Sequence, residues 1–467
     1  MEEEFDTPKV NFVPCVKIVR QGASKSNPVQ IQLTRPELVK LSKNVNVNTD
    51  DLNEDEDEQG TESEAPTNEA DEYDMEHYND DDRIAMKVSD IAIFEDDDPY
   101  KSASIDLPDS DEEDDIIKPN DNLVLVGHVE GATPILEVYV YNEKEDSFYC
   151  HHDYLLPKIP LALEWLNHDP TNTNEPGNLC AVGYVTPIIG VWDLDIVNCV
   201  EPAFKLGKKG NARNRVPRVG HKKAVLDLSW NQNFHHILAS GSVDETVILW
   251  DLDKAEPSIT LDCFEGSAQS LKWHSEEAQT LLVGSGDKTC RVFDCRTSDI
   301  QGTYKVKGEV EKVLWNPFSK TQFIASDDKG YIYAFDYKQN KKLWEVQAHS
   351  QEVTGVAFSS SCPGLLCTTC QDGQMKVWDI QSKKPECVHE RNLKIGAIHC
   401  LDSAPDLPFI MASGGDNKSK NLIVFNAMKK PEVKEAFQGR FIASSSKRSA
   451  SDNSTEKEDD DVEMETT

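Results

Sequence analysis

The sequence carries little positive charge and has no long apolar segment. Its 467 residues include 84 Asp and Glu but only 48 Lys and Arg, so the formal net charge is −36. No apolar run is long enough to cross a membrane, no signal peptide is recognisable, and no glycine-rich phosphate loop occurs. We therefore expect no membrane association, no cofactor and no small-molecule substrate.

The twelve cysteines are scattered along the chain, which indicates free thiols in a reducing intracellular compartment. Cys367 and Cys370 form a CxxC pair near Cys362. Positions three apart on a strand point to opposite faces, however, and no second ligand pair follows at a finger-like spacing. The adjacent rings of His151 and His152 likewise diverge in an extended chain. The sequence therefore predicts no metal site.

Aromatic residues recur with a fixed period in the second half of the chain. Pairs lie 20 residues apart, at Trp230 and Trp250, Trp273 and Phe293, Trp315 and Phe335, and Phe358 and Trp378. The first members step by 43, 42 and 43, and the repeats end in ILWDLD, RVFDCR, YAFDYK and KVWDIQ. A period of about 40 to 45 residues with a Trp-Asp ending is the signature of a four-stranded propeller blade.

Alternating apolar residues mark the strands of these blades. VLDLSW, HILASGS and TVILWD read as three strands of one blade, while LALEWL at Trp165 and GVWDLD at Trp192 form a blade with a longer turn. Further strand-like segments precede and follow, from DNLVLVGHV to NLIVFNA. The sequence predicts an all-β, seven-bladed WD-repeat β-propeller over residues 117–427. Within residues 1–45 we expect a short helix and a strand, NFVPCVKIVR, that closes the ring as the outer strand of the last blade.

Two blades carry a polar set that WD-repeat proteins use to join their strands. The sets are Asp244, His221, Ser240 or Ser242, and Trp250 in one blade, and Asp372, His349, Thr368 and Trp378 in the other. Each buried polar group needs a hydrogen-bond partner, and the trio of Asp, His and hydroxyl recurs at blade spacing. We therefore interpret the trio as structural, not as a hydrolase triad, and predict no catalytic residue. The blade of Trp315 lacks the set, so we expect it to depend on apolar contacts.

Residues 46–116 form an acidic arm. Residues 50–115 hold 29 Asp and Glu against three Lys and Arg, and such a run cannot bury enough apolar surface to fold alone. We predict that the arm is mostly disordered and either solubilises the protein or engages basic partners such as histones or ribosomal proteins. The tail, residues 428–467, is also acidic and predicted to be disordered. Ser110 and Thr455, both beside carboxylates, are candidate phosphorylation sites.

One basic segment interrupts this acidity, in an inter-blade insertion over residues 203–220. Residues 205–223 contain eight cations and no carboxylate: Lys205, Lys208, Lys209, Arg213, Arg215, Arg218, Lys222 and Lys223. An exposed basic loop can contact RNA phosphates, act as a nuclear import element, or neutralise the acidic arm in cis. It lacks the interleaved aromatics that stack on bases.

Long segments of the chain resemble the periodic tryptophan protein 1 family. They include CVKIVRQGASKSNPVQIQLTRPELVKL, IKPNDNL, LEVYVYNEKEDSFYCHHD, TPIIGVWDLDIV and EAQTLLVGSGDK, so the resemblance runs nearly end to end. It implies a nuclear, largely nucleolar protein of ribosome biogenesis and ribosomal RNA gene transcription, with links to chromatin and no catalysis. We thus expect a non-enzymatic scaffold for pre-ribosomal or transcription factors. The alternative is a histone-binding chromatin factor that uses the acidic arm and a propeller face.

Overall fold

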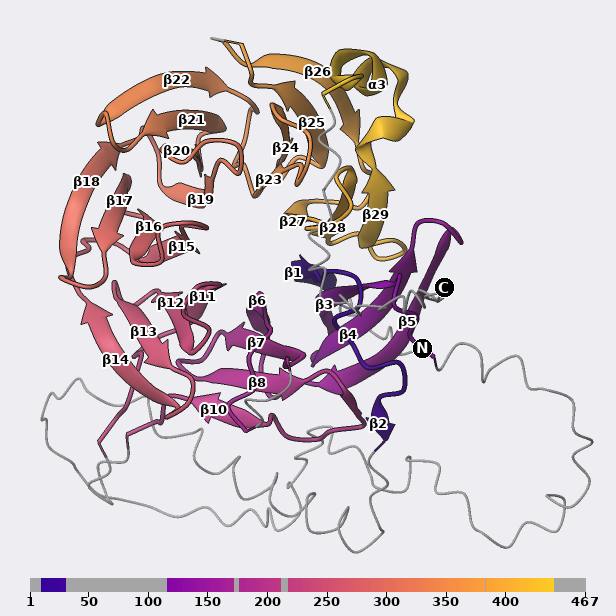
Figure 1. Ribbon diagram of the computed structural model, residues 1–467, viewed down its shortest axis with the longest axis vertical. Helices are drawn as coiled ribbons and strands as arrows, with labels where there is room; N and C mark the ends of the chain where they lie inside the picture. The colour runs from indigo at the N-terminus through magenta and orange to yellow at the C-terminus, as the bar shows by residue number, and fades with distance from the viewer. Residues whose placement is uncertain (1–9, 31–115, 172–175, 211–216, 383, 441–467) are drawn as a thin grey trace, which may run out of the picture. The chain divides into compact units, whose positions relative to one another are not determined.

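The computed structural model describes residues 10–30, 116–171, 176–210, 217–382 and 384–440 (Figure 1). The chain divides into two units, residues 1–28 with 117–467 and residues 29–116, and the blades all belong to the first. The acidic arm up to residue 115 and the tail beyond residue 440 lie outside the described residues. Residues 10–30 contain no helix, and the rest of the segment predicted to hold a short helix lies outside the described part.

Seven antiparallel sheets surround a central channel (Figure 1). Blade 1 contains β1 (Asn11–Ile18), β3 (Asn122–Glu130), β4 (Thr133–Asn142) and β5 (Ser147–Leu155); blade 2 contains β6 (Pro160–Leu166), β7 (Leu179–Tyr184), β8 (Ile189–Asp193) and β10 (Phe204–Leu206). Blade 3 contains β11 (Val225–Trp230), β12 (Ile237–Ser242), β13 (Val247–Asp251) and β14 (Glu256–Leu261); blade 4 contains β15 (Ala268–Trp273), β16 (Thr280–Ser285), β17 (Thr289–Asp294) and β18 (Asp299–Lys305). Blade 5 contains β19 (Val310–Trp315), β20 (Gln322–Asp327), β21 (Tyr331–Asp336) and β22 (Lys341–Gln347); blade 6 contains β23 (Gly355–Phe358), β24 (Leu365–Thr369), β25 (Gln374–Asp379) and β26 (Glu386–Asn392). Blade 7 has three strands, β27 (Ile398–Ser403), β28 (Ile410–Gly415) and β29 (Leu422–Asn426). The predicted seven-bladed β-propeller is confirmed.

The 20-residue spacing of the aromatic residues follows from the register of the strands. In blade 3, Trp230 lies opposite Leu238, and Leu238 lies opposite Trp250 on the next strand. Blades 4 to 6 repeat this row of three large side chains across the sheet. Each aromatic pair therefore flanks a central apolar residue and presents one wide surface to a neighbouring blade.

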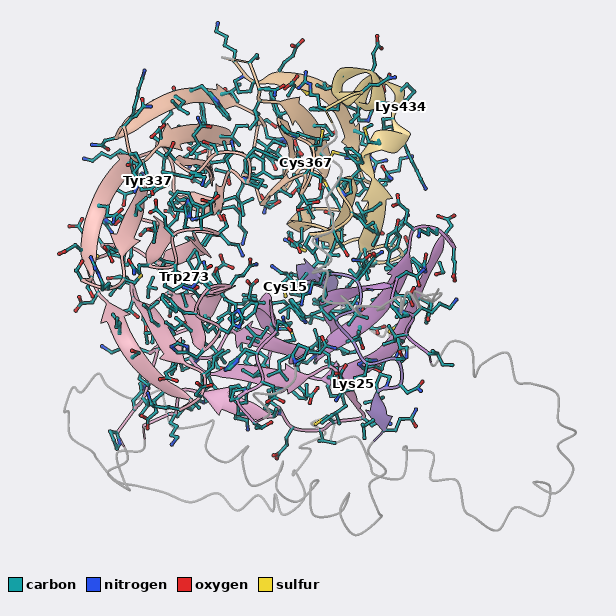
Figure 2. The ribbon with its side chains drawn as sticks, viewed as in Figure 1. Cys15, Lys25, Trp273, Tyr337, Cys367 and Lys434 are labelled. Atoms are coloured by element: carbon teal, nitrogen blue, oxygen red, sulfur yellow. The ribbon has the colours of Figure 1, made fainter. Side chains whose placement is uncertain are left out.

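The apolar core is divided into seven clusters, one at each interface between neighbouring blades. Trp250 of blade 3, for example, packs with Ile189 and Val191 of blade 2. Figure 2 shows side chains filling the spaces between sheets, as around Trp273 and Cys367. Because each sheet is covered on both faces by its neighbours, the ring needs no separate hydrophobic centre.

The N-terminal strand closes the ring, but in a different place from the one predicted. β1 pairs with β3 and is the innermost strand of blade 1, not the outer strand of blade 7. Its apolar side chains, Val13, Val16 and Ile18, pack in the cluster shared with blade 7. Blade 1 therefore joins two segments more than 100 residues apart, and the propeller includes residues 11–18.

The outer side of blades 6 and 7 is covered by helices within the predicted disordered tail. The 3₁₀ helix η4 (Ala427–Lys429) and the helix α3 (Pro431–Phe437) follow β29. Val433 and Phe437 are buried in the cluster between blades 6 and 7. The prediction was wrong for residues 428–440 because these two side chains, four apart, form an apolar helix face that average composition conceals.

Candidate interaction surfaces

The seven inner strands share one residue pattern. Each ends in a six-residue segment: VPCVKI (13–18), PLALEW (160–165), VLDLSW (225–230), AQSLKW (268–273), VEKVLW (310–315), VTGVAF (353–358) and IHCLDS (398–403). In β6, β11, β15, β19 and β27 a register shift lies directly before the third residue of the segment. The third and fifth residues lie near the channel.

Polar side chains at these two positions bind the next blade. The carboxylates and hydroxyls among them accept a hydrogen bond from a backbone N–H of the following inner strand, an edge strand that lacks a strand partner on this side. These latch bonds, defined as side chain to next-blade N–H, are Glu164 to Trp230 (3.2 Å), Asp227 to Leu271 (2.9 Å), Ser229 to Trp273 (3.2 Å), Ser270 to Val313 (3.3 Å) and Asp402 to Ile18 (2.8 Å). Much of the polarity of the channel is therefore structural.

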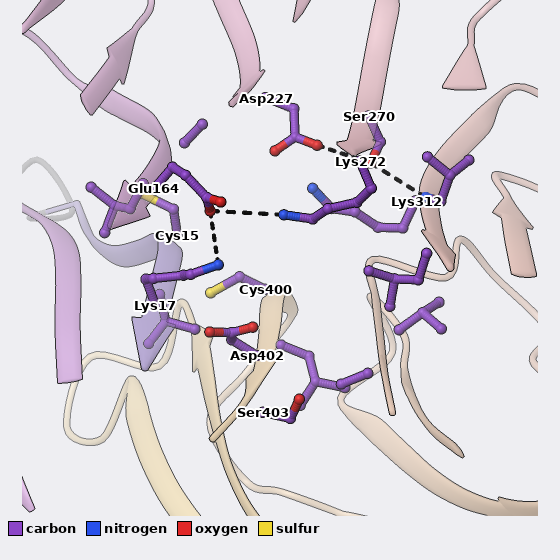
Figure 3. A pocket seen from close by; sticks show the side chains of 18 of the residues that line it. Cys15, Lys17, Glu164, Asp227, Ser270, Lys272, Lys312, Cys400, Asp402 and Ser403 are labelled. Carbon is purple, nitrogen blue, oxygen red and sulfur yellow. Dashed lines mark hydrogen bonds and ion pairs between the residues drawn. The ribbon is translucent and has the colours of Figure 1, made fainter. Parts of the chain in front are cut away.

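The channel encloses a cavity of about 300 Å³, and a cluster of charged side chains from Glu164, Lys17 and Lys272 lines it (Figure 3). The carboxylate of Glu164 lies 2.8 Å from the ammonium of Lys17 and 3.8 Å from that of Lys272. Although burial alone would raise it, these two ammonium groups hold the pKa of the Glu164 carboxyl below its usual value. The ammonium of Lys312 makes no ion pair with any described residue, so it remains available to an anionic partner.

The arc of the channel formed by blades 5 to 7 is open to a ligand. Its latch positions hold Lys312 and Leu314 in blade 5 and Gly355 and Ala357 in blade 6, none of which can accept a hydrogen bond from the next strand. The hydroxyl of Ser360, which also lines the cavity, is buried without a described partner. The arc therefore offers donors to a carboxylate or to the carbonyls of an inserted peptide. Among the described channel residues, no hydroxyl or thiol makes a hydrogen bond to a histidine.

The polar set of blade 3 forms as predicted, with Ser240 in the hydroxyl position. Trp250 Nε1 donates to Ser240 Oγ (2.8 Å), and Ser240 Oγ bonds His221 Nε2 (2.7 Å). His221 Nδ1 lies 3.2 Å from both oxygens of Asp244. Ser242 does not take part in this series of hydrogen bonds. Its hydroxyl instead accepts a hydrogen bond from the backbone N–H of Asp244.

Blade 6 builds only part of the same set. Trp378 Nε1 and His349 Nε2 both bond Thr368 Oγ1, at 2.9 and 2.8 Å. His349 Nδ1, however, is buried without a partner. Asp372 instead accepts from the backbone N–H of Gln374 (2.9 Å) and lies 3.4 Å from Ser350 Oγ.

Two other blades replace the set with tyrosine, which sequence reasoning missed. In blade 5 the hydroxyl of Tyr333 donates to the buried carboxylate of Asp327 at 2.7 Å. In blade 2 Tyr184 Oη accepts from Trp192 Nε1 at 2.9 Å. The prediction that the Trp315 blade depends on apolar contacts was therefore incomplete. In blade 5, Tyr333 lies two residues before Phe335 on the third strand, and this spacing was the sequence signal for the tyrosine bond.

The basic segment is partly built into blade 2. Lys205 lies in β10, whose Phe204 and Leu206 pack toward blade 3, because alternate residues of a strand face opposite sides. Lys208 bridges to Val219, so the predicted insertion begins inside a blade. Six cations of the segment are exposed and form no ion pair with any described residue: Lys205, Lys208, Lys209, Arg218, Lys222 and Lys223. Arg213, Arg215, Ser110 and Thr455 lie outside the described residues.

The adjacent histidines of blade 1 do not diverge as expected. His151 sits at a register shift between β4 and β5, where Val138 pairs with His152 and Tyr139 with Cys150. The extra residue turns the two rings together, and their Nδ1 atoms lie 2.8 Å apart. All twelve cysteines are free thiols.

The fold and the repeated polar sets define a WD-repeat propeller. The model of the WD domain, G-beta repeat, matches residues 214–251 and 340–379. The propeller of Doa1 resembles the structure with a TM-score of 0.52 at 15% identity, covering 67% of this chain and 90% of that one. None of the described helices is long and apolar enough to span a bilayer.

The sequence comparison narrows this class to one family. The chain is 40% identical to the periodic tryptophan protein 1 homolog of Drosophila melanogaster over 93% of its own length and 98% of that protein. It belongs to the periodic tryptophan protein 1 family. Partial matches cover 44% of the chain with histone acetyltransferase type B subunit 2 of Candida glabrata (29% identical, 48% of that protein) and 42% with a ribosome biogenesis protein WDR12 homolog of Drosophila mojavensis (24%, 47%).

Proposed function

We propose that this protein is a non-enzymatic scaffold of the nucleus and nucleolus that acts in ribosome biogenesis and ribosomal RNA gene transcription. The observation that carries the proposal is a propeller whose channel polarity is largely used in latch bonds, together with six exposed cations on the outer strand of blade 2 and the segment after it that form no ion pair with any described residue. Such a surface docks other molecules and performs no chemistry of its own. Family membership and the likeness to a relative named for ribosome biogenesis support the same role.

The basic segment is the proposed contact with the pre-ribosomal particle. Lys205 lies in a strand of blade 2 and Lys208 in a bridge to Val219, so these two cations are held by paired backbone. Side chains held in this way contact RNA phosphates with less ordering cost than those of a flexible loop. The same residues can serve as a nuclear import element. They can also contact acidic residues of the arm. Each of these roles predicts a different result when the charges of the basic segment are neutralised.

Nuclease-treated affinity purification at moderate salt, with quantitative mass spectrometry, tests the scaffold. A variant carrying Gln at Lys205, Lys208, Lys209 and Arg218 is compared with a control carrying Gln at Lys341, Lys384, Lys394 and Lys420, which are equally exposed. We expect assembly or ribosomal RNA transcription factors with the wild type. In a parallel purification without nuclease and by imaging in cells, we expect loss of RNA recovery or nucleolar retention only in the first variant. Unchanged recovery and localisation would contradict a role for the segment.

A histone-binding role is the second candidate. It is favoured by the 29 carboxylates of residues 50–115 and by the partial likeness to a histone acetyltransferase subunit. In the same purification, recovery of stoichiometric histones at moderate salt would support the histone-binding role over the scaffold role. Histones released by a small increase in salt indicate only general attraction to the acidic arm.

A further inference from the structure

The polar sets of blades 3 and 6 occupy equivalent positions, and besides the exchange of Ser240 for Thr368, which keeps the hydroxyl, they differ at two residues nearby. Where blade 3 has Ser242 and Thr246, blade 6 has Cys370 and Gln374. Thr246 Oγ1 lies 3.1 Å from His221 Nδ1 and donates to Asp244, and so completes the set in blade 3. In blade 6 the hydroxyl of Thr246 is replaced by the amide of Gln374, and the thiol of Cys370 lies near His349.

These exchanges leave a buried imidazole nitrogen without a hydrogen bond. His349 is 4% exposed, and its Nδ1 has no described partner, whereas the equivalent nitrogen of His221 has three candidate partners within 3.2 Å. An unsatisfied buried polar atom costs stability, about 1–3 kcal/mol, and its presence calls for an explanation such as a bound ion.

We propose that His349, Cys370 and Asp372 bind a divalent metal ion of the zinc class. Their ligand atoms, one nitrogen, one sulfur and one carboxylate oxygen, all lie within 4.8 Å of one another. Imidazole, thiolate and carboxylate are the three ligand types that zinc takes in proteins, and a tetrahedral ion with bonds of about 2.0–2.3 Å needs only a small contraction of this set. Binding releases the thiol proton of Cys370 to solvent, because the thiolate is the ligand.

The surroundings of the site suit an ion. His349 Nε2 is bonded to Thr368, which also accepts from Trp378, so the ring is oriented with Nδ1 toward the other two ligands. His349 and Asp372 line a polar cavity of about 470 Å³ that also reaches Ser350 and Glu390. Cys370 does not line the cavity, so an ion enters from the side of His349 and Asp372, where there is room for water as the fourth ligand. Lys376 also lines the cavity, and its charge is paired with Glu390. The CxxC partner Cys367 takes no part, because its sulfur lies 3.7 Å from that of Met375 in the apolar core.

Cobalt(II) titration of the metal-free full-length protein tests the site. Co²⁺ replaces Zn²⁺ in tetrahedral sites and reports a thiolate ligand by charge-transfer absorption together with visible d–d bands. We expect one equivalent of Co²⁺ to give both signals, Zn²⁺ to displace them, and Zn²⁺ to raise the melting temperature.

Two variants separate this site from the other eleven thiols. Cys370→Ser restores the residue that blade 3 carries at the same position, so it is compatible with folding, and it is expected to lose both absorption signals and the shift in melting temperature. Cys387→Ser, an exposed cysteine of the same blade, is the matched control and should keep them. Absence of the signals in the wild-type protein, or their persistence in Cys370→Ser, would overturn the proposal.

Discussion

Glu164 and Lys17 join the N-terminal strand of blade 1 to the inner strand of blade 2. They lie 147 residues apart in sequence, in the inner strands of blades 2 and 1, and their charged atoms are 2.8 Å apart. Burial opposes the charge on Lys17, but the carboxylates of Glu164 and Asp402 outweigh it and raise the pKa of the ammonium. A buried pair of this kind gives little net stability over apolar residues, but removal of one partner is costly.

Glu164→Gln should therefore destabilise the propeller. The change removes the ion-pair partner that Lys17 and Lys272 share, and we expect the free energy of unfolding to fall by about 3 kcal/mol. Chemical denaturation followed by tryptophan fluorescence measures this. The control is Glu145→Gln, which removes the exposed pair with Lys118 and should leave the unfolding midpoint unchanged. If both substitutions change the free energy of unfolding equally, the buried pair contributes no more to stability than the exposed one.

Glu311 should make stability depend on pH between about 4.5 and about 7. Burial, with the nearby Glu352 carboxylate, raises the pKa of Glu311 from its ordinary 4.5 to about 7, against the opposing effect of Lys312. In this range the folded protein keeps a proton that the unfolded chain releases, so this residue stabilises the fold at low pH and the benefit is lost as the pH rises. Glu311→Gln lacks the effect. We expect it to gain stability relative to wild type from pH 5 to pH 8, in thermal melts where the exposed control Glu256→Gln gains none.

The two polar sets should differ in their response to removal of the carboxylate charge. Asp244 accepts bonds from His221, Thr246 and the backbone of Lys222, and these hold its pKa below the usual range although burial opposes them. Asp244→Asn should cost about 2 kcal/mol. With a chelator present, Asp372→Asn should cost less than half as much, because Asp372 makes no bond to His349. If the two substitutions lower the free energy of unfolding equally, His349 and Asp372 form a hydrogen bond in solution.

The periodic rows of large side chains explain why the fold was readable from sequence. Trp230, Leu238 and Trp250 lie opposite one another in blade 3, and blades 4 to 6 repeat this row, so a spacing of 20 reports sheet register directly. β1 was assigned as a strand for its alternation, but alternation does not specify a partner. Its place was set by contacts with β3, from which the acidic arm separates it in sequence.

The polar sites were only partly predictable, because residue type does not fix which bonds form. The sequence of blade 6 contains the Asp, His, hydroxyl and Trp of the predicted set, yet His349 and Asp372 do not bond. The latch bonds of Glu164 and Asp227 also escaped sequence reasoning, since they join strands 66 and 44 residues apart across neighbouring blades. In hindsight a polar residue at the third or fifth position of an inner strand was a usable signal.

The helix α3 should stabilise blades 6 and 7. Phe437 is 1% exposed and packs in the cluster between these blades, and Arg440 lies over its ring and 2.8 Å from Asp379. Phe437→Ala leaves a cavity in this cluster, and we expect a loss of about 3 kcal/mol in the free energy of unfolding. Glu435→Ala, on the exposed side of the same helix, is the control and should leave the unfolding curve in place. If both variants unfold like the wild type, α3 is not part of the cooperative propeller.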